Sequence, residues 1–416
     1  MSRSLRVDRK FIKTVKLALK RHGFPNQEAF AKKIEMARST VVNFLNGKPV
    51  DFANFVQICD KLGLDWKDIA TELSDEPYQP DSGDSSFYVD RPPTESNCYQ
   101  AIVKSGALLR IKAPQQMGKT WLMRRVLSYA EKQGYETVTL SFELADNTVF
   151  TDLEKFSQWF CAAVGQELGL PNQLNSSWAD ILACNYNTTN YFQTYLLANR
   201  ASPLVLALDN VDIVFEYREI AIDFCRLLRN WHDQANRGDR YSDIWQKLRL
   251  VIVHATEVYG GLDINSSPLA GVGVVVDLPE FNSEQVKDLA KRCELTCNNS
   301  HIEKLMSLVG GHPYLVQLAI ERMKLQGVTL DRILETAHTE AGIYSNHLRE
   351  HLGNLEKYPE LGKAFREVVV MDNPVELNPV QAFKLHSMGL VNLAGNQVTP
   401  RCKLYRNYFR ERLGKK

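Results

Sequence analysis

The sequence predicts a multidomain α/β protein: an all-α domain first, then a parallel-sheet domain with a helical extension, then a small mixed module. Apolar runs that alternate with amphipathic segments predict a parallel sheet covered by helices on both faces. The runs cover residues 107–112, 136–144, 203–210, 249–258 and 272–281. Near the C-terminus, two β-type runs flank Gly395-Asn396, a two-residue turn that predicts a hairpin.

The composition is that of a globular protein. Of 416 residues, 44% are hydrophobic and 24% are charged, which excludes the disordered and collagen-like classes. No apolar run approaches the roughly 20 residues of a membrane helix, and the first residues contain no apolar signal core. We therefore expect a cytoplasmic protein with no membrane partner.

The eight cysteines are spread along the chain, so we expect reduced thiols rather than a disulfide framework. One cluster, Cys293, Cys297 and His301, has ligand-like spacing. It offers three ligands and no clear fourth, whereas structural zinc takes four. We interpret these residues as ordinary helix-end residues.

The charge is distributed unevenly. Residues 1–50 carry twelve Lys/Arg and three Asp/Glu, a net of +9, and residues 51–100 carry three and eleven, a net of −8. Such a basic block favours contact with phosphate. The polar stretch SDEPYQPDSGDSS lacks periodicity and indicates a linker. We therefore expect a first domain at 1–73 and a linker at 74–86.

The first domain is predicted to contain a helix-turn-helix. Apolar residues recur at helical spacing in 11–20, and two short segments, QEAFAKKI and RSTVVNFLNG, flank a three-residue break at 35–37. The run FAKKIEMARSTVVNFLNGK resembles the Cro/repressor-like family. Two positions depart from that family's pattern: Glu35 stands where the turn glycine is usual, and Ala37 stands where a capping Ser or Thr is usual.

The resemblance implies which residues of the second helix read DNA and which residues of the two helices pack inside. The expected base-facing residues are Arg38, Ser39, Val42 and Asn43. The expected core-facing residues are Phe30, Ala31, Val41, Phe44 and Leu45. An alternative remains open, in which the domain is a helical adaptor that binds a protein partner and the lysines form a solvated face.

The middle of the chain contains a phosphate-loop motif. An apolar strand leads into Ala113-Pro114-Gln115-Gln116-Met117-Gly118-Lys119-Thr120, and an amphipathic helix beginning near Trp121 follows. Backbone N–H groups of such a loop cradle phosphates, the lysine reaches the β- and γ-phosphates, and the hydroxyl ligates Mg²⁺. Ala113 replaces the usual first glycine. We expect this loop, from Ala113 to Trp121, to bind ATP and Mg²⁺.

A second apolar strand ends in Asp209, as a Walker B strand does. Asp209 is the expected magnesium residue, together with Thr120. The next residue is Asn210, where a hydrolytic ATPase usually has a glutamate, so hydrolysis is left open. Glu216 or Asp212 could substitute, although Asp212 more readily caps the following helix. In the run at 249–258, His254 and Thr256 are candidates for the polar sensor residue, and His254 could equally be a buried structural histidine.

Four segments together resemble the bacterial AAA-like domain family, which is related to STAND ATPases and to archaeal winged-helix ATPases. They are FYVDRPP at 87–93, APQQMGKT, LALDNVDIVF and GGHPYL at 310–315. The resemblance covers about residues 87 to 413. It implies that the segment Tyr88–Arg91 lies beside the base and that Gly311-His312-Pro313 belongs to a helical lid that closes on the nucleotide. We accordingly expect an ATPase core at 87–282 and a lid at 283–352.

The last expected domain, 353–416, combines helices with the hairpin VNLAGNQVTP and a closing helix. The same resemblance implies a winged helix packed on the ATPase core. The hairpin sequence LAGNQV has no Lys or Arg, which favours a clamp on the nucleotide domain over DNA binding. Basic residues of the tail, such as Arg401, fit either use.

The sequence therefore predicts an ATP-binding regulatory switch whose N-terminal domain binds DNA or a protein partner, with nucleotide state controlling assembly, as a homo-oligomer or with another protein. One alternative is a DNA-remodelling, transposition-type or origin-type ATPase that assembles on duplex DNA. Another is an adaptor with a degenerate, non-hydrolysing nucleotide site. The sequence does not identify the DNA site, the protein partner or the size of the oligomer.

Overall fold

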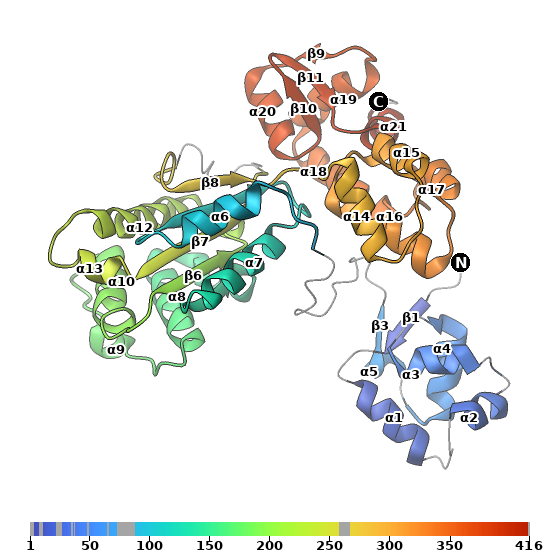
Figure 1. Cartoon of the computed structure of the whole chain (residues 1–416), viewed down its shortest axis with the longest axis horizontal. Coiled ribbons are helices and arrows are strands. Elements are labelled where there is room, and N and C mark those ends of the chain that lie inside the picture. The colour runs from blue at the N-terminus through green and yellow to red at the C-terminus, as the bar shows by residue number, and fades with distance from the viewer. Residues whose placement is uncertain are drawn as a thin grey trace. The chain divides into compact units, whose positions relative to one another are not determined.

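The computed structural model describes residues 4–7, 11–21, 27–34, 36, 38–47, 50–64, 66–72, 88–257 and 267–414. The chain forms two compact units, residues 1–82 and 83–416 (Figure 1). The expected linker, residues 74–86, lies outside the described residues.

The first unit combines helices with a small antiparallel sheet in the order β2-β1-β3. Its helices are α1 (Ile12–Arg21), α2 (Gln27–Lys33), α3 (Arg38–Leu45), α4 (Phe52–Lys61) and α5 (Trp66–Ile69). Its strands are β1 (Ser4–Val7), β2 (Val50–Asp51) and β3 (Ala70–Glu72). The prediction of an all-α domain was wrong. In β1, Leu5 and Val7 alternate into the core, but strands this short give little periodic signal.

The pair α2 and α3 packs through the residues expected on its inner side. Phe30, Ala31, Val41, Phe44 and Leu45 are all buried, as predicted. The Met36 N–H donates to Ala31 O at 3.0 Å in the connection between the helices. Glu35 and Ala37, the two departures from the repressor-like pattern, lie outside the described residues.

The second unit is built around a five-stranded parallel sheet in the order β5-β6-β7-β4-β8 (Figure 1). Its strands are β4 (Leu108–Ala113), β5 (Glu136–Ser141), β6 (Leu204–Asp209), β7 (Leu248–Ala255) and β8 (Val274–Asp277). The strand β7 lies between β4, which leads into the phosphate loop, and β6, which ends in Asp209. Because all five strands are parallel, their carboxyl ends meet at one edge, where open α/β sheets bind ligands.

Alternating side chains of the strands fill two cores. On one face, Leu109 and Ile111 pack with α6 (Thr94–Ile102) and α7 (Lys119–Lys132). On the other face, Leu108 packs in the core formed with α8 (Leu153–Glu167), α10 (Cys184–Tyr191) and α12 (Arg218–Asn236). The short helices of this region are α9 (Leu174–Ser177), α11 (Asp212–Phe215) and α13 (Ser242–Trp245). Single helical turns also occur at Phe142–Leu144, Val149–Thr151 and Phe192–Leu196.

A helical region that corresponds to the expected lid follows β8, and we refer to it as the lid. It comprises α14 (Ser283–Arg292), α15 (Asn299–Val309), α16 (Pro313–Gln326), α17 (Leu330–Thr336) and α18 (Ser345–Lys357). Asn282 and Gln285 form a capping box that fixes the start of α14. Pro313 is the first residue of α16, the position where its missing N–H costs nothing.

The C-terminal module contains α19 (Pro359–Val370), β9 (Val375–Glu376), α20 (Pro379–Ser387), β10 (Val391–Ala394), β11 (Gln397–Pro400) and α21 (Lys403–Leu413). Its sheet has the order β10-β11-β9, and Ala394 pairs with Gln397 across the turn Gly395-Asn396. The hairpin prediction is therefore confirmed. A single helix, α20, lies between β9 and β10. The stretch between these two strands therefore contains no pair of helices joined by a short turn. The winged-helix assignment of this module stays a prediction.

The lid and the C-terminal module share one continuous hydrophobic core that extends from Phe281 to Phe409 and also includes Val89. The domain boundary expected between residues 352 and 353 falls inside α18. Gly353 does not end that helix, because a single interior glycine costs only about 1 kcal/mol and the packed faces of α18 outweigh it. Among the described residues, no three His, Cys, Asp or Glu side chains are grouped as a metal site would need. No described helix is long and apolar enough to cross a membrane.

Candidate nucleotide-binding site

The phosphate loop connects β4 to α7 at the carboxyl edge of the sheet. Gly118 precedes the helix with φ 89°, and Gln116 has φ 60°, a left-handed conformation that is uncommon outside glycine. The Lys119 Nζ donates to Ala113 O at 3.2 Å and to Pro114 O at 2.9 Å. The loop thus curls around the amine of its own lysine, and Ala113 and Met117 are buried beneath it.

Thr120 and Asp209 come together as expected for a magnesium site. The Thr120 hydroxyl donates to Asp209 Oδ2 at 3.1 Å. Burial raises the pKa of Asp209, and the hydrogen bond from Thr120 opposes the rise. A hydroxyl and a carboxylate at the mouth of a phosphate loop are the oxygen ligands that Mg²⁺ takes beside nucleotide phosphates, so the donor set fits the ion.

Carboxylates surround Lys119. Burial lowers the pKa of Lys119, while the negative charges of Asp212, Glu257 and Asp209 oppose that decrease. Asp212 is the first residue of α11, and its Oδ1 accepts from the Ala255 N–H at 2.8 Å. Its carboxylate therefore joins the ends of β6 and β7. The expectation that Asp212 caps the helix was wrong, because Val211 is the residue at that position.

Glu257, which the sequence analysis did not single out, lies two residues beyond β7. Its Oε1 accepts a long hydrogen bond, 3.3 Å, from the Gln115 N–H of the phosphate loop. Burial raises the pKa of Glu257 to about 7, and Lys119 opposes the rise. Its Oε2 is buried and has no hydrogen-bond partner among the described residues. A carboxylate near the end of the apolar run predicted at 249–258 was the available signal.

Asn210 follows Asp209 in the left-handed conformation, with φ 56°. Its N–H donates to Asp209 Oδ1 at 3.0 Å, and its Nδ2 donates to Ser141 Oγ at 3.3 Å at the end of β5. Asparagine adopts this conformation more readily than most residues. Glu216, one of the two possible substitutes for a catalytic glutamate, is exposed at the end of α11.

The two sensor candidates on β7 face different surroundings. His254 is buried, its Nδ1 lies 2.8 Å from Ala255 O, and its ring packs edge-on against Phe215. Burial lowers the pKa of His254 to about 4, so the ring is neutral. The Thr256 hydroxyl donates to Ser387 O at 2.7 Å, which joins the sheet edge to α20 of the C-terminal module.

Arg91 donates a hydrogen bond to the backbone of the phosphate loop. Its Nη1 donates to Met117 O at 2.8 Å and to Pro279 O at 3.2 Å, and its guanidinium lies over the Phe281 ring. Burial lowers the pKa of Arg91. Trp121, in the first turn of α7, contacts the guanidinium of its neighbour Arg124. Arg91 therefore joins the loop to the segment that leads into the lid.

The segment Gly311-His312-Pro313 begins α16 in the lid. The Phe281 N–H donates to Gly311 O at 2.8 Å, and a Cβ on Gly311 would lie 1.9 Å from Phe281 O. Only glycine permits this close approach of the two backbones. His312 is buried, and its ring centroid lies 5.4 Å from that of His347 in α18.

His347 connects the loop to both parts of the C-terminal half. Its Nδ1 donates to Gln116 Oε1 at 2.8 Å, and its Nε2 accepts from the Tyr405 hydroxyl at 2.7 Å. Burial lowers the pKa of His347 well below its usual value, so the ring is neutral, with one donor and one acceptor nitrogen. Both nitrogens are satisfied. His351, four residues later on the same face of α18, packs edge-on against His347.

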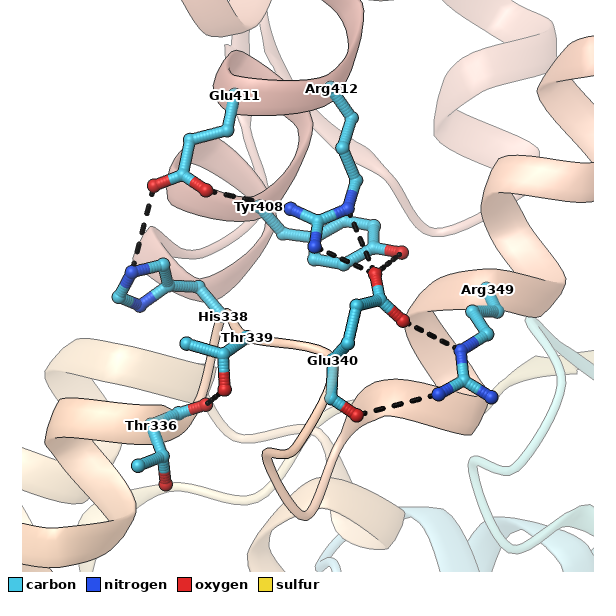
Figure 2. Close-up of polar contacts among 8 residues, drawn as sticks. All are labelled: Thr336, His338, Thr339, Glu340, Arg349, Tyr408, Glu411 and Arg412. Carbon is cyan, nitrogen blue, oxygen red and sulfur yellow. Dashed lines mark hydrogen bonds and ion pairs between the residues drawn. The ribbon is translucent and has the colours of Figure 1, made fainter.

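A second polar cluster fastens the lid to α21 (Figure 2). The Glu340 carboxylate accepts from Arg349 Nε of α18 at 2.7 Å, from Arg412 Nη2 of α21 at 2.7 Å and from the Tyr408 hydroxyl at 3.2 Å. His338 Nε2 lies 3.7 Å from Glu411 Oε1. We call these residues the Glu340 clasp. Hydrogen bonds from Arg349 and Arg412 lower the pKa of Glu340.

Comparison with solved structures supports the fold. The Walker-type ATPase PABY2304 of Pyrococcus abyssi matches with TM-score 0.55 and 14% identity, covering 78% of this chain and 96% of that one. AMPPCP-bound DnaA from Aquifex aeolicus matches at TM-score 0.37 and 15% identity, covering 73% and 79%. The Aeropyrum pernix Orc1 protein in complex with DNA matches at 0.34 and 13%, covering 78% and 93%.

These identities are low, so the similarity to the Pyrococcus abyssi protein establishes the P-loop ATPase fold alone. No curated protein matches the chain. A model of the AAA-like domain matches residues 76–411, which contain the phosphate loop, the sheet, the lid and nearly all of the C-terminal module. The chain belongs to the AAA-like domain family.

Proposed function

We propose that this chain is an ATP-binding regulatory switch, with nucleotide and Mg²⁺ held by Lys119, Thr120 and Asp209. The observation that carries the proposal is the chain of hydrogen bonds from Gln116 through His347 to Tyr405. It connects a residue of the phosphate loop to the lid and to the C-terminal helix. A nucleotide that reshapes the loop would therefore act directly on both.

The shared core supports a particular form of the switch. Because the lid and the C-terminal module pack as one body, a rearrangement is easier at the junction of that body with the sheet. Among the described residues, the polar contacts that cross this junction include Gln116 with His347, Thr256 with Ser387, Glu280 with Arg401 at 2.6 Å, and Gln285 Nε2 with Asp90 O at 2.8 Å. Opening would break these contacts and expose a surface for a second copy or a protein partner.

Slow turnover is part of the proposal. The Asn210 side chain is an amide directed toward Ser141, and an amide cannot accept a proton from the attacking water. A bound nucleotide would then persist long enough to set the state of the molecule. ATP hydrolysis would reset the switch rather than drive continuous work.

Nucleotide binding is tested with Lys119→Ala in the full chain. The variant is expected to lose measurable ATP binding by calorimetry, because the loop loses the cation that meets the phosphates. Lys132→Ala is the matched control, since Lys132 is exposed at the other end of the same helix. Equal ATP affinity in Lys119→Ala and the wild type would refute the proposed function.

A second candidate function is an ATPase that assembles on duplex DNA, and the charge of the first unit favours it. Lys32 and Lys33 are exposed in the last turn of α2, and Arg38 is exposed at the start of α3. Val42 and Asn43 are half-buried one turn later, and Ser39 lies in the same helix. This arrangement suits contact with a phosphate backbone or a groove.

The DNA candidate is tested by fluorescence anisotropy of a labelled duplex with the full chain. Arg38→Ala is expected to weaken binding, and binding should decrease steeply with salt because phosphate contacts release counterions. Lys61→Ala, an exposed lysine at the end of α4, is the control. ATP-dependent assemblies that form only with DNA would favour this candidate over the switch, and a chain that binds no duplex at low salt would leave the adaptor interpretation.

A further inference from the structure

Glu257 accepts a hydrogen bond from the phosphate loop, as a phosphate oxygen would. Loop N–H groups bind anions, and here the Gln115 N–H donates to a carboxylate oxygen of the chain itself. Gln115 belongs to the part of the loop nearest β4, opposite the end where α7 begins. The other carboxylate oxygen is buried without a partner among the described residues.

Lys119 faces Glu257, and the loop has further anion-binding groups at its other end. The first turn of α7 begins after Gly118, which has no side chain to cap the helix. Thr120 and Asp209 contact each other, and neither bonds to Glu257. A nucleotide could therefore occupy the helix end and the magnesium residues while Glu257 keeps its place at the other end of the loop.

We infer that Glu257 occupies the position of a terminal phosphate and so makes the loop select a nucleoside diphosphate over a triphosphate. The inference rests on the proposed function, since it concerns the same loop. A γ-phosphate that approached the Gln115 N–H would meet a negative carboxylate, one oxygen of which is buried, and the two like charges would repel each other. A diphosphate, which is one phosphate shorter, avoids this repulsion.

Protonation of Glu257 would remove the repulsion. The charged and titratable groups that face this carboxylate are Lys119 of α7, Asp212 of α11, Glu350 of α18 and Tyr405 of α21. Burial raises the pKa of Glu257 to about 7, so the group is charged at pH 8 and largely neutral at pH 6. Triphosphate affinity should therefore increase as the pH decreases through 7, whereas diphosphate affinity should change little.

The test is calorimetry of the full chain with MgADP and with the non-hydrolysable triphosphate MgAMPPCP. At pH 8 the wild type should prefer MgADP. Glu257→Gln should bind MgAMPPCP about tenfold more tightly than the wild type, within the usual range of coupling between neighbouring sites, and MgADP about equally. Glu219→Gln, which changes an exposed carboxylate in the first turn of α12, should leave both affinities unchanged.

The pH series is a second measurement that needs no new variant to fold. Lowering the pH from 8 to 6 should increase the affinity of the wild type for MgAMPPCP more than that of Glu257→Gln. The titration of the nucleotide itself is common to both proteins and cancels in this difference. If Glu257→Gln does not fold, Glu257→Asp replaces it, because the shorter side chain withdraws the charge from the Gln115 N–H.

The outcomes distinguish a failure of this inference from a failure of the proposed function. An unchanged affinity ratio in Glu257→Gln overturns the inference and leaves the proposed function standing. An unchanged ratio with slower ATP hydrolysis also overturns it and makes Glu257 a general base instead. A wild type that binds neither nucleotide overturns both the inference and the proposed function.

Discussion

Two glutamates of this chain have pKa values shifted in opposite directions. Glu257, beside the phosphate loop, has a raised pKa because burial disfavours its charge. Glu340, at the centre of the clasp in Figure 2, has a lowered pKa because Arg349 and Arg412 donate hydrogen bonds to it. Burial thus destabilises the negative charge of Glu257, whereas two arginines stabilise the negative charge of Glu340.

This difference distinguishes the candidate nucleotide-binding site from the Glu340 clasp, which is a structural contact. At the loop, Lys119 faces three carboxylates in an enclosed space, an arrangement that a bound anion would change. In the clasp, Glu340 and Arg349 are each about half exposed, at 51% and 54%, and water screens their attraction. We therefore expect substitutions near the loop to have large effects and substitutions in the clasp to have small ones.

The largest effect on stability is expected for His347→Leu. It leaves the buried Tyr405 hydroxyl without its partner, at a cost of about 1–3 kcal/mol, and it also removes the contact with the exposed Gln116 side chain. The matched control is His338→Leu in the clasp, where the histidine is partly exposed and the cost should stay below about 0.5 kcal/mol. Urea denaturation of both variants measures the difference, and equal losses would erase the distinction between the two regions.

An intermediate effect is expected for Asn210→Glu. A left-handed conformation costs a glutamate roughly 1 kcal/mol of stability, but the new carboxylate can accept a proton from water, so ATP turnover should increase. Asn210→Gln carries the same strain without the carboxylate and should show no such increase. Phosphate release measures the rate. A wild type that turns over faster than about 1 s⁻¹, the lower end of ordinary enzymes, would contradict the slow-switch interpretation.

The smallest effect is expected for Glu340→Gln, which should cost at most about 1 kcal/mol at low salt and almost nothing at 1 M salt. A carboxyl group with a lowered pKa stabilises the fold above its unfolded pKa and loses that contribution as the pH falls through its folded value. The stability difference between the wild type and the variant should therefore disappear in acid. A difference that persists at 1 M salt would show that the clasp is more than a screened surface network.

The sequence was most informative where the signal is local. The strand, loop and helix around Lys119 are consecutive, so the spacing of Gly118, Lys119 and Thr120 was enough to predict them. Asp209 could be placed next to Thr120 because parallel strands end at one edge. The burial of Phe30 and Phe44 followed from the resemblance of this segment to the Cro/repressor-like pattern.

The sequence was least informative where partners are distant. Glu257 contacts Gln115, 142 residues earlier, and His347 contacts Gln116, 231 residues earlier. No period or motif specifies such pairs. The i, i+4 spacing of His347 and His351 places both on one helix face, but by itself it does not say what that face meets. The short strand β1 was missed because its pairing with β2 and β3 depends on tertiary contacts.

The order of the sheet has a consequence for synthesis of the chain. The strand β4 pairs only with β7 and β8 in the described sheet, and Leu108 lies opposite Leu250. The apolar strand that leads into the phosphate loop therefore leaves the ribosome 142 residues before its first partner. At about 5–20 residues per second, that strand waits roughly 7–28 s with unpaired backbone groups. During that interval the exposed apolar strand favours aggregation of the nascent chain.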